Sequence, residues 1–385
     1  MTMIKIIIGG DVCPMGELQD AFIAGDVHSL YDDLLEPIKA ADLAVANLEC
    51  PLISKDTPIR KPGIRLAASV HSIHGIVKAG WHVLNLANNH CFDHGVNGLQ
   101  ETILTIKNAG LNSVGAGMNI REARLPYITT IKDQQIVIYA MAEREYSIAG
   151  EKTAGANPLD LIDFIHAIHS YKQNRVFIVL LHGGKENYSY PSPEMIRRCR
   201  FMVEMGADAV ICCHTHGPLP WEIYAGRPII YGLGNLLFEN DQPIQEEWHE
   251  GYLAEMTING PIIAFNPIPY LQCKTKPGAK KMDDGVLEEF LQKMHSRNAH
   301  LQESEFLNAR WIEHCQQKKD AYLLELIGFN LGLRKLGSLL LHALHSSNTI
   351  LTALHLAQCE THQEVLNTIF KLMTQDDDRP LSNHR

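Results

Sequence analysis

The residues with the clearest chemical potential follow a short apolar run at residues 81–84. There the chain carries Asn88, Asn89 and His90, with Asp93 and His94 shortly after. The apolar run is typical of a buried strand, and open α/β sheets usually place their chemistry at the carboxyl ends of strands. Amides, imidazoles and a carboxylate are costly to hold near a core unless partners satisfy them. A metal ion is one such partner, so other strand ends should supply matching groups.

Histidines follow two further apolar runs. Residues 175–181 lead into His182, and the glycines behind it allow a ligand to approach the backbone closely. A histidine that closes a strand before a turn is also an ordinary feature. Residues 207–213 lead into His214 and His216, which is the strongest single signal in the chain. Positions i and i+2 share one side of an extended chain, and core packing gives no reason to place two imidazoles there.

Carboxylates follow the two earliest apolar runs. Asp11 comes after residues 4–8 and a pair of glycines, where an aspartate can bind a metal or cap a helix or turn. Glu49 comes after residues 43–46, and Pro51 ends that strand. Each residue alone has an ordinary interpretation as a cap or a solvated side chain. Their joint placement with the histidines makes the ordinary interpretation improbable.

Together these strand-end residues form a set of carboxylate, amide and imidazole groups that requires no thiolate. Such ligands suit Mn, Fe or Zn better than Mg alone. One catalytic ion usually takes three or four protein ligands, so the larger set indicates two divalent metal ions with Glu49 as the bridging carboxylate. The predicted metal ligands are Asp11, Glu49, Asn89, His182, His214 and His216.

The residues around Asn89 receive separate roles. His90 is the predicted catalytic residue, a general acid that protonates the leaving group. Asn88 and Asp93 are expected to hold the turn and orient a neighbouring imidazole, and His94 is expected at the surface. Cys13 could bind a metal as a thiolate, although a buried structural thiol is its more ordinary role.

The elements that must position these groups alternate between apolar runs and helical patterns, which predicts an α/β fold. Helices are expected at 30–41, 70–79, 98–109, 158–172 and 193–205, and an antiparallel pair at 127–131 and 135–140. A hairpin is expected over 252–258 and 262–269, with Asn259-Gly260 at its turn. Residues 274–284 are the predicted linker from a domain at 1–273 to a helical appendage at 285–375, and residues 376–385 a disordered tail.

Composition excludes several classes of function. The net charge of −10 argues against a nucleic-acid binder. The nine cysteines show no close-spaced framework and indicate buried free thiols in a reducing compartment. No run approaches the length of a membrane span, and the amino terminus has no room for a signal peptide before Asp11. We therefore expect a cytoplasmic protein.

At these residues the sequence resembles the poly-γ-glutamate capsule synthesis protein family of the CapA type, a branch of the calcineurin-like metallophosphoesterases. The resemblance covers residues 4–270 and rests on short motifs in the family's order. These motifs are Gly10-Asp11-Val12, Asn47-Leu48-Glu49-Cys50-Pro51-Leu52, Leu86 to His90 with Asp93 and Gly95, Leu181 to Glu186, Cys213 to Pro218 with Glu222 and Tyr224, and Ile230 to Asn235.

The resemblance implies a metallophosphoesterase-like β sandwich flanked by helices, with two metals at one edge. Carried over by position, Asp11 and His216 would bind one metal, while Asn89, His182 and His214 would bind the other. Glu49 would bridge them in place of the superfamily's usual aspartate, and His90 keeps the catalytic position. Residues expected to meet substrate or to support the ligands are Asn88, Asp93, Glu186, Glu222 and Asn235.

Three departures accompany the resemblance. The superfamily often has a histidine where this chain has Cys13, and a tryptophan where it has Gly183. Capsule-related members usually carry an amino-terminal membrane anchor, which we do not expect here.

The expected activity is metal-dependent hydrolysis of a phosphoester or a γ-glutamyl-type amide, in poly-γ-glutamate or capsule biosynthesis. The substrate would be an anionic small molecule or polymer. The alternative is a non-catalytic or accessory subunit of an amide-polymer synthesis complex, whose carboxy-terminal helices bind a protein partner. A degenerate fold kept only for its structure is a third interpretation.

Overall fold

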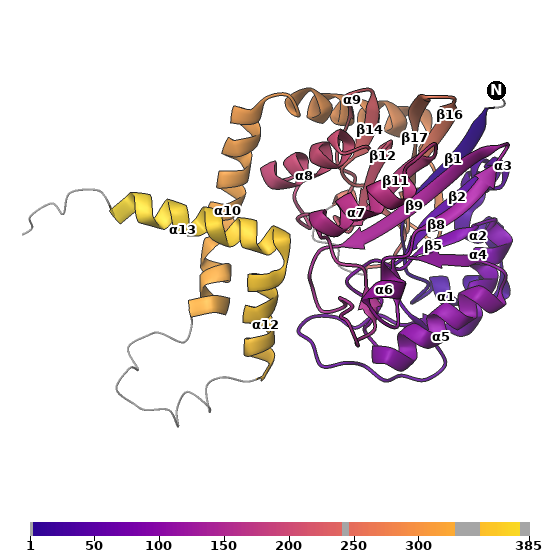
Figure 1. Ribbon diagram of the computed structural model, residues 1–385, viewed down its shortest axis with the longest axis horizontal. Helices are drawn as coiled ribbons and strands as arrows, with labels where there is room; N and C mark the ends of the chain where they lie inside the picture. The colour runs from indigo at the N-terminus through magenta and orange to yellow at the C-terminus, as the bar shows by residue number, and fades with distance from the viewer. Residues whose placement is uncertain (1–2, 241–245, 328–346, 378–385) are drawn as a thin grey trace, which may run out of the picture.

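Two β-sheets lie face to face in the computed structural model, which describes residues 3–240, 246–327 and 347–377 (Figure 1). The first sheet has the order β18-β17-β16-β1-β2-β5-β6, with β15 also paired to β1. Its strands, in that order, are Ala279–Lys281, Ile262–Gln272, Glu250–Asn259, Ile4–Val12, Leu43–Leu48, Val83–Asn85 and Asn112–Val114, with β15 at Asn235–Leu237. β1, β2, β5 and β6 are parallel, so their carboxyl ends lie at one edge.

The second sheet has the order β13-β14-β12-β11-β9-β8. Its strands, in that order, are Trp221–Tyr224, Arg227–Ile230, Ala209–Cys213, Val176–His182, Gln134–Ala142 and Tyr127–Ile131. The four inner strands β14, β12, β11 and β9 are parallel, and β8 pairs with β9 in antiparallel fashion as predicted. The predicted hairpin of β16 and β17 is also confirmed.

The main core lies between the sheets, and strand β9 shows how the sequence builds it. Ile136 and Ile138 belong to the core cluster shared with the first sheet, whereas Val137 and Tyr139 belong to the cluster under the outer helices. This alternation follows from the two-residue period of a strand. Cys212 and Cys213 divide between the two clusters in the same way, and all nine cysteines are free, as predicted.

Helices cover the outer faces of both sheets. The second sheet is covered by α7 (Leu161–Tyr171) and α8 (Pro193–Glu204). The first sheet packs against α1 (Leu18–Ala24), α4 (Ile73–Ala79) and α5 (Gly95–Asn108). The predicted helix at 30–41 is divided among α2 (Val27–Tyr31), a 3-10 turn at Asp32–Leu34 and α3 (Leu35–Ala40), because Asp32 has a positive φ of 43°.

Short elements complete the connections. They are β3 (Leu52–Ile53), β4 (Ala68–Ser69), a 3-10 turn at Val70–Ser72, β7 (Ala116–Gly117), α6 (Ile120–Ala123), β10 (Gly155–Ala156) and a 3-10 turn at Glu246–His249. Within the part of the chain that the structure describes, no helix is both long enough and apolar enough to cross a bilayer. The α/β sandwich flanked by helices, with further helices after it, confirms the predicted fold class.

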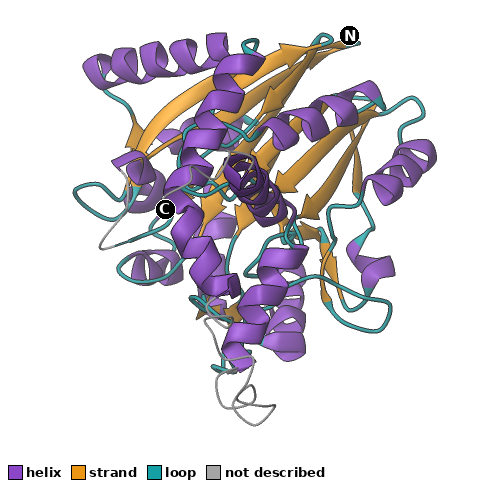
Figure 2. Ribbon diagram, turned by 90° about the vertical axis from the view of Figure 1, so that its left-hand side faces the viewer, coloured by secondary structure: helices purple, strands orange, loops and turns teal. Residues whose placement is uncertain are grey.

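The linker predicted at 274–284 is wrong, because β18 lies within it and extends the first sheet beside β17. Helix α9 (Asp284–His300) then returns to the sandwich, where Phe290 and Met294 join the main core. The remaining helices are α10 (Ser304–Ile327), α12 (Ser347–Gln358) and α13 (Glu360–Asp377). They share a small core of their own, and Figures 1 and 2 show them beside the second sheet. Of the predicted disordered tail, 378–385 lie outside the described residues.

Candidate metal centre

The carboxyl ends of the first sheet carry a row of polar residues at one level. Strand register places Asp11 opposite Asn235 on one side and Asn47 on the other, and Asn47 opposite Asn85. The Asn47 amide donates to Asp11 Oδ1 at 2.7 Å, and the Asn85 amide donates to Asn47 Oδ1 at 3.0 Å. A Cβ on Gly10 would lie 1.9 Å from the carbonyl oxygen of Gly234, so only glycine lets β15 come this close. These contacts hold the buried side chain of Asp11 in place.

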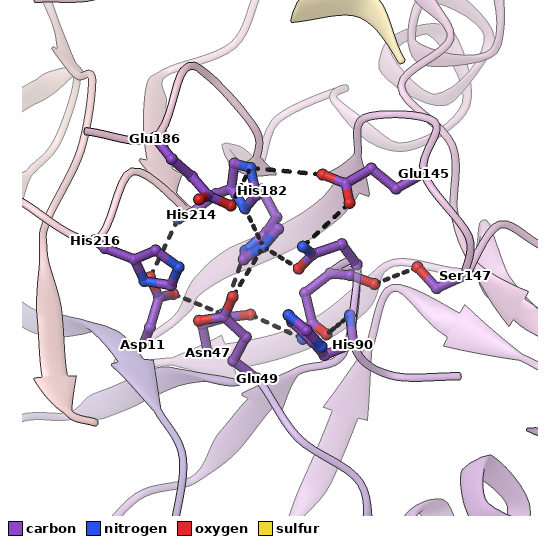
Figure 3. A network of polar contacts seen from close by, with 12 residues as sticks. Asp11, Asn47, Glu49, His90, Glu145, Ser147, His182, Glu186, His214 and His216 are labelled. Carbon is purple, nitrogen blue, oxygen red and sulfur yellow. Dashed lines mark hydrogen bonds and ion pairs between the residues drawn. The ribbon is translucent and has the colours of Figure 1, made fainter. Parts of the chain in front are cut away.

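The second sheet brings histidines to the same place (Figure 3). His182 is the last residue of β11, and His214 and His216 follow the end of β12. The two later histidines do not sit in extended chain as predicted: their φ angles are 95° and 59°, in the left-handed region. A non-glycine residue in that region costs free energy and persists only where its surroundings hold it. The imidazoles therefore meet through a strained turn rather than through the period of a strand.

Four ligand atoms surround one point of the site. Nε2 of His182 lies 3.0 Å from Oδ1 of Asn89, 3.1 Å from Nδ1 of His214 and 3.5 Å from Oε1 of Glu49. Ligands bound about 2.1 Å from one ion are separated by about 3.0–3.4 Å, so this spacing suits a shared cation. Burial lowers the pKa of His182 to about 4 and that of His214 well below its usual value. Both imidazoles are therefore neutral near pH 7, as metal binding requires.

A second group of ligand atoms lies beside the first. Asp11, Glu49 and His216 each offer one atom, and these atoms all lie within 4.8 Å of one another. Nδ1 of His216 is 3.0 Å from Oδ1 of Asn235, which holds that ring through its N–H and leaves Nε2 available. Asp11 Oδ2 accepts the backbone N–H of His214 at 3.2 Å. The structure thus brings all six predicted ligands together, in the two groups that the resemblance implies.

The surroundings of Glu49 show whether these residues suit cations. Its side chain is fully buried, and neither carboxylate oxygen has a hydrogen-bond partner among the described residues. Burial raises its pKa, and burial with the neighbouring Glu49 raises the pKa of Asp11 to about 6. An isolated buried carboxylate is unfavourable unless a cation compensates it. Glu49 belongs to both groups of ligand atoms, so this donor set fits two adjacent ions.

His90 lies at the edge of the cluster and is held from behind. Its Nδ1–H donates to Asp93 Oδ2 at 2.7 Å, and its backbone N–H donates to Asn88 Oδ1 at 3.1 Å. Asp93 also forms an ion pair with the buried Lys61. Burial would raise the pKa of Asp93, but His90 and Lys61 outweigh it and lower that pKa. Since Nδ1 faces Asp93, Nε2 is the ring nitrogen of His90 that can hold a proton for a reacting group.

Several site residues were not predicted. Glu145 accepts from the Asn89 amide at 3.2 Å and lies 3.5 Å from His214 Nε2. Burial, aided by Glu186, raises the pKa of Glu145 to about 8. It follows the end of β9, so the strand-end criterion could have found it. The other unpredicted members are Asn47, Asn85, Lys61 and Ser147, whose hydroxyl donates to the Asn88 carbonyl at 2.6 Å.

Some predicted positions lie elsewhere. Glu186 is at the rim, 3.7 Å from His214 Nε2. Glu222 was expected to meet substrate or support a ligand, and that is wrong: both its oxygens bind Arg200 at 2.8 Å. It lies on β13, at the edge of the sheet, where it also accepts the hydroxyl of Tyr231. The expected exposure of His94 is wrong as well, because its ring is buried and accepts the Thr57 N–H at 3.0 Å.

Cys13 is outside both groups of ligand atoms found among the described residues. Its thiol is buried, and burial with the neighbouring Cys50 raises its pKa well above the usual value. A buried neutral thiol supports the structural role rather than the role of a metal ligand.

Fold and site together define an α/β sandwich with a carboxylate- and imidazole-rich cluster at the carboxyl ends of its parallel strands. The chain belongs to the family described as bacterial capsule synthesis protein PGA_cap, whose model matches residues 5–240. The matched range includes every member of the cluster from Asp11 to Asn235. The resemblance drawn from the sequence motifs is therefore confirmed.

Three relatives illustrate the family. The chain is 29% identical over 212 residues to the capsule biosynthesis protein CapA of Bacillus anthracis, which covers 52% of each protein. It is 31% identical over 212 residues to the PGA biosynthesis protein CapA of Bacillus subtilis strain 168, covering 53% of this chain and 56% of that protein. A probable polyglutamine synthesis accessory protein of Mycobacterium tuberculosis strain H37Rv is 27% identical over 234 residues, covering 57% and 60%. The chain thus spans about half the length of the relatives it matches.

Solved structures are more distant. A hypothetical protein from Thermus thermophilus aligns with a TM-score of 0.45 and 13% identity, over 70% of this chain and 99% of that one. The 5′-nucleotidase of Candida albicans SC5314 aligns with a TM-score of 0.38 and 10% identity, over 65% and 47%.

Proposed function

We propose that this protein is a hydrolase that depends on two divalent metal ions, of the calcineurin-like metallophosphoesterase type. The main support is Glu49, a fully buried carboxylate without hydrogen-bond partners among the described residues. Its oxygens belong to both groups of candidate ligand atoms. Asp11 and His216 would hold one ion, and Asn89, His182 and His214 the other, with Glu49 between them. The mixed donor set favours Mn, Fe or Zn.

The chemistry follows from these positions. When bound, two adjacent ions polarise a phosphoryl or carbonyl oxygen and lower the pKa of water. His90 holds the proton that the leaving group requires, and Asp93 fixes its ring by accepting Nδ1–H at 2.7 Å. His90 together with Lys61, which pairs with Asp93, lowers the pKa of that carboxylate and keeps it ionised. Asn235 fixes His216 in the same way.

The substrate class we propose is an anionic phosphoester or a γ-glutamyl-type amide, with a role in poly-γ-glutamate or capsule biosynthesis. The family and the names of the two Bacillus relatives support that setting. An ester or amide carbonyl and a phosphoryl group both develop negative charge on oxygen during hydrolysis, which a dicationic site stabilises. We also expect the protein in the cytoplasm, and cell fractionation tests that prediction.

The decisive experiment measures metal content and turnover on the same sample. Full-length protein loaded separately with Mn, Fe or Zn should contain close to two ions per chain by elemental analysis. It should then hydrolyse bis(p-nitrophenyl) phosphate or a γ-glutamyl p-nitroanilide, and lose that activity in EDTA. A protein that holds no ion after loading contradicts the proposal.

A second candidate function is that of an accessory subunit in an amide-polymer synthesis complex. The observation that favours it is that one relative is named as a probable polyglutamine synthesis accessory protein. Helices α10, α12 and α13 would then bind the partner. An isolated monomer that turns over a substrate rapidly argues against this candidate, whereas co-purification with an amide-forming ligase supports it.

A further inference from the structure

Residues Glu143–Tyr146, which we call the linking segment, join the candidate metal centre to the carboxy-terminal helices. The segment follows the end of β9, at the same edge of the sheet as the histidines. One of its side chains points to the metal centre, and the other three contact α12 or α13. Segments more than 200 residues apart in sequence therefore meet beside the site.

Glu145 is the member that reaches the metal centre (Figure 3). Its Oε2 accepts the Asn89 amide N–H at 3.2 Å, which turns Oδ1 of Asn89 toward His182. Its Oε1 lies 3.5 Å from Nε2 of His214, so Nδ1 of that ring faces His182. Glu145 thus orients two of the candidate ligands of one ion without occupying a ligand position itself.

Arg144 and Glu143 are held by the first turn of α13. The backbone N–H of Arg144 donates to Glu360 at 2.7 Å, and its guanidinium donates to the same carboxylate at 2.6 Å. Thr361 donates its hydroxyl to the buried carboxylate of Glu143 at 2.6 Å. Glu143 also accepts the backbone N–H of Gly184, two residues after His182. The start of α13 therefore holds the segment and, through Glu143, the turn behind a ligand.

Tyr146 is held by α12. Its ring stacks on His355 with 4.9 Å between centroids and 17° between planes, and its hydroxyl donates to the Leu351 carbonyl at 3.4 Å. Nζ of Lys61 lies 6.0 Å from the centroid of the Tyr146 ring and 3.3 Å from Nδ1 of His90. The residues on both sides of Glu145 are therefore fixed by helices outside the sandwich.

We propose that the docked helices α12 and α13 position Glu145, and that Glu145 in turn orients Asn89 and His214 for metal binding. This inference rests on the proposed function, because it concerns the ion held by Asn89, His182 and His214. It makes Glu145 a positioning residue and makes the helices part of the metal centre. Loss of docking should lower the affinity for this ion more than the affinity for the other. The ligands Asp11 and His216 of the other ion are held by Asn47 and Asn235, which belong to the first sheet.

The test uses Mn²⁺ alone as the probe, titrated into the metal-free full chain by calorimetry. The wild type should bind two ions. The double variant Glu360→Ala/Thr361→Val removes the α13 contacts and should weaken one of the two affinities about tenfold or more, the usual effect of losing an outer-shell partner. Glu145→Ala should weaken the same affinity, and Glu145→Gln, which keeps an acceptor for the Asn89 amide but loses the one that faces His214 Nε2, should restore only part of it.

Controls separate this effect from general damage to the helices. Glu313→Gln breaks an exposed pair with Arg310 on α10, away from the linking segment, and should leave both affinities unchanged. Hydrogen exchange of peptides covering 142–147 gives a readout that needs no metal. The Arg144 amide loses its Glu360 acceptor in the double variant and should exchange faster. Tyr146→Leu tests the same coupling from α12 should the double variant fold poorly.

The outcomes are distinguishable. A wild-type chain that binds no Mn²⁺ contradicts the proposed function, and this inference with it. A wild type that binds two ions, together with docking and Glu145→Ala variants of unchanged affinity, contradicts the inference alone. An equal loss of affinity for both ions in the docking variants also overturns the inference, because that result indicates a general loss of structure.

Discussion

At the scale of single residues, His90 carries the most specific prediction. Its Nδ1–H is held by Asp93, so Nε2 is the atom that can hold a proton for the leaving group. Replacing it by asparagine removes the proton donor and keeps a similar polar shape beside Asn89. We expect His90→Asn to lower kcat by about 10²–10⁴-fold, the usual contribution of a general acid. Steady-state kinetics and elemental analysis on the same preparation measure turnover and metal content together.

Metal content decides how that result is interpreted. Two retained ions with lost turnover support the role of His90 as the acid. If His90→Asn loses an ion as well, His90 is a ligand or a structural residue and its catalytic assignment is wrong. Asp93→Asn is the matched control: it weakens the support of the ring but leaves the imidazole in place, so its loss of kcat should be smaller.

At the scale of elements, the strand-end criterion predicts much of the candidate site. Asp11, Glu49, Asn89 and His182 end apolar runs, and parallel strands carry such ends to one edge of a sheet. The expectation for Glu222 came from the family resemblance instead, and it is wrong because the edge strand β13 turns that residue toward Arg200 on α8. The strand-end criterion missed the linking segment, whose contacts with α12 and α13 join parts of the chain too distant for a local pattern to connect.

Backbone geometry in the turns was a second limit of the sequence. The period of a strand predicted that His214 and His216 point to the same side. The structure instead brings them together through positive φ angles of 95° and 59°. Neither position carries glycine, which is the usual choice for this conformation, so the residue types at 214 and 216 do not signal it. Likewise, the polar composition of 274–284 concealed β18, which is held by its pairing with β17.

The turn after β11 supports a prediction at this scale. A Cβ on Gly183 would lie 2.6 Å from Cγ of Glu143, a buried side chain that also holds Gly184 and Thr361. A larger side chain at position 183 therefore cannot coexist with Glu143 in its present place. Gly183→Ala should destabilise the protein by about 1–3 kcal/mol, as overpacking usually does. Urea unfolding of the full chain measures the change.

The matched control is Gly285→Ala, near the start of α9. A Cβ there meets nothing within 4 Å, so the substitution adds helix propensity without a clash. It should stabilise the protein by up to about 1 kcal/mol. Two alanine variants with the same free energy of unfolding would show that Glu143 can move aside without cost.

At the scale of the whole molecule, the candidate metal centre joins the two sheets. Asp11, Glu49 and Asn89 come from the first sheet, and His182, His214 and His216 from the second. Ions bound between them would connect the two layers of the sandwich. Because a ligand that binds only the folded state stabilises it by RT ln(1 + [L]/Kd) per site, Mn²⁺ at about 100 times its Kd should add about 2.7 kcal/mol for each ion bound.

Thermal unfolding with increasing Mn²⁺ measures that linkage. The melting temperature should rise with the logarithm of free Mn²⁺ and return in EDTA. The variant Glu49→Gln, which removes the shared carboxylate charge, should show little or none of the rise. A melting temperature that is independent of Mn²⁺ in the wild type would contradict the idea that ions join the sheets.

The same centre predicts how pH affects the metal-free protein. Burial, with Glu49, raises the pKa of Asp11 from 3.8 to about 6. A carboxyl with a raised folded pKa contributes stability that is present below its unfolded pKa and is lost as pH rises through its folded pKa. Ionising Asp11 should therefore lower the free energy of unfolding of the metal-free protein by about 3 kcal/mol between about pH 4 and 6. Buried His182, with its pKa lowered to about 4, acts in the opposite direction over this range, so the total change does not isolate Asp11.

The variant Asp11→Asn isolates it, because an amide of the same shape cannot ionise and can still accept the N–H of His214. In EDTA, the free energy of unfolding of Asp11→Asn minus that of the wild type should increase from about pH 4.5 to 7.5, by urea unfolding at each pH. With saturating Mn²⁺ the trend should reverse, because the wild type then gains from an ionised Asp11 that binds the cation and the variant does not. A difference that stays constant with pH in EDTA would show that Asp11 keeps an ordinary pKa and that the centre tolerates its charge without a metal.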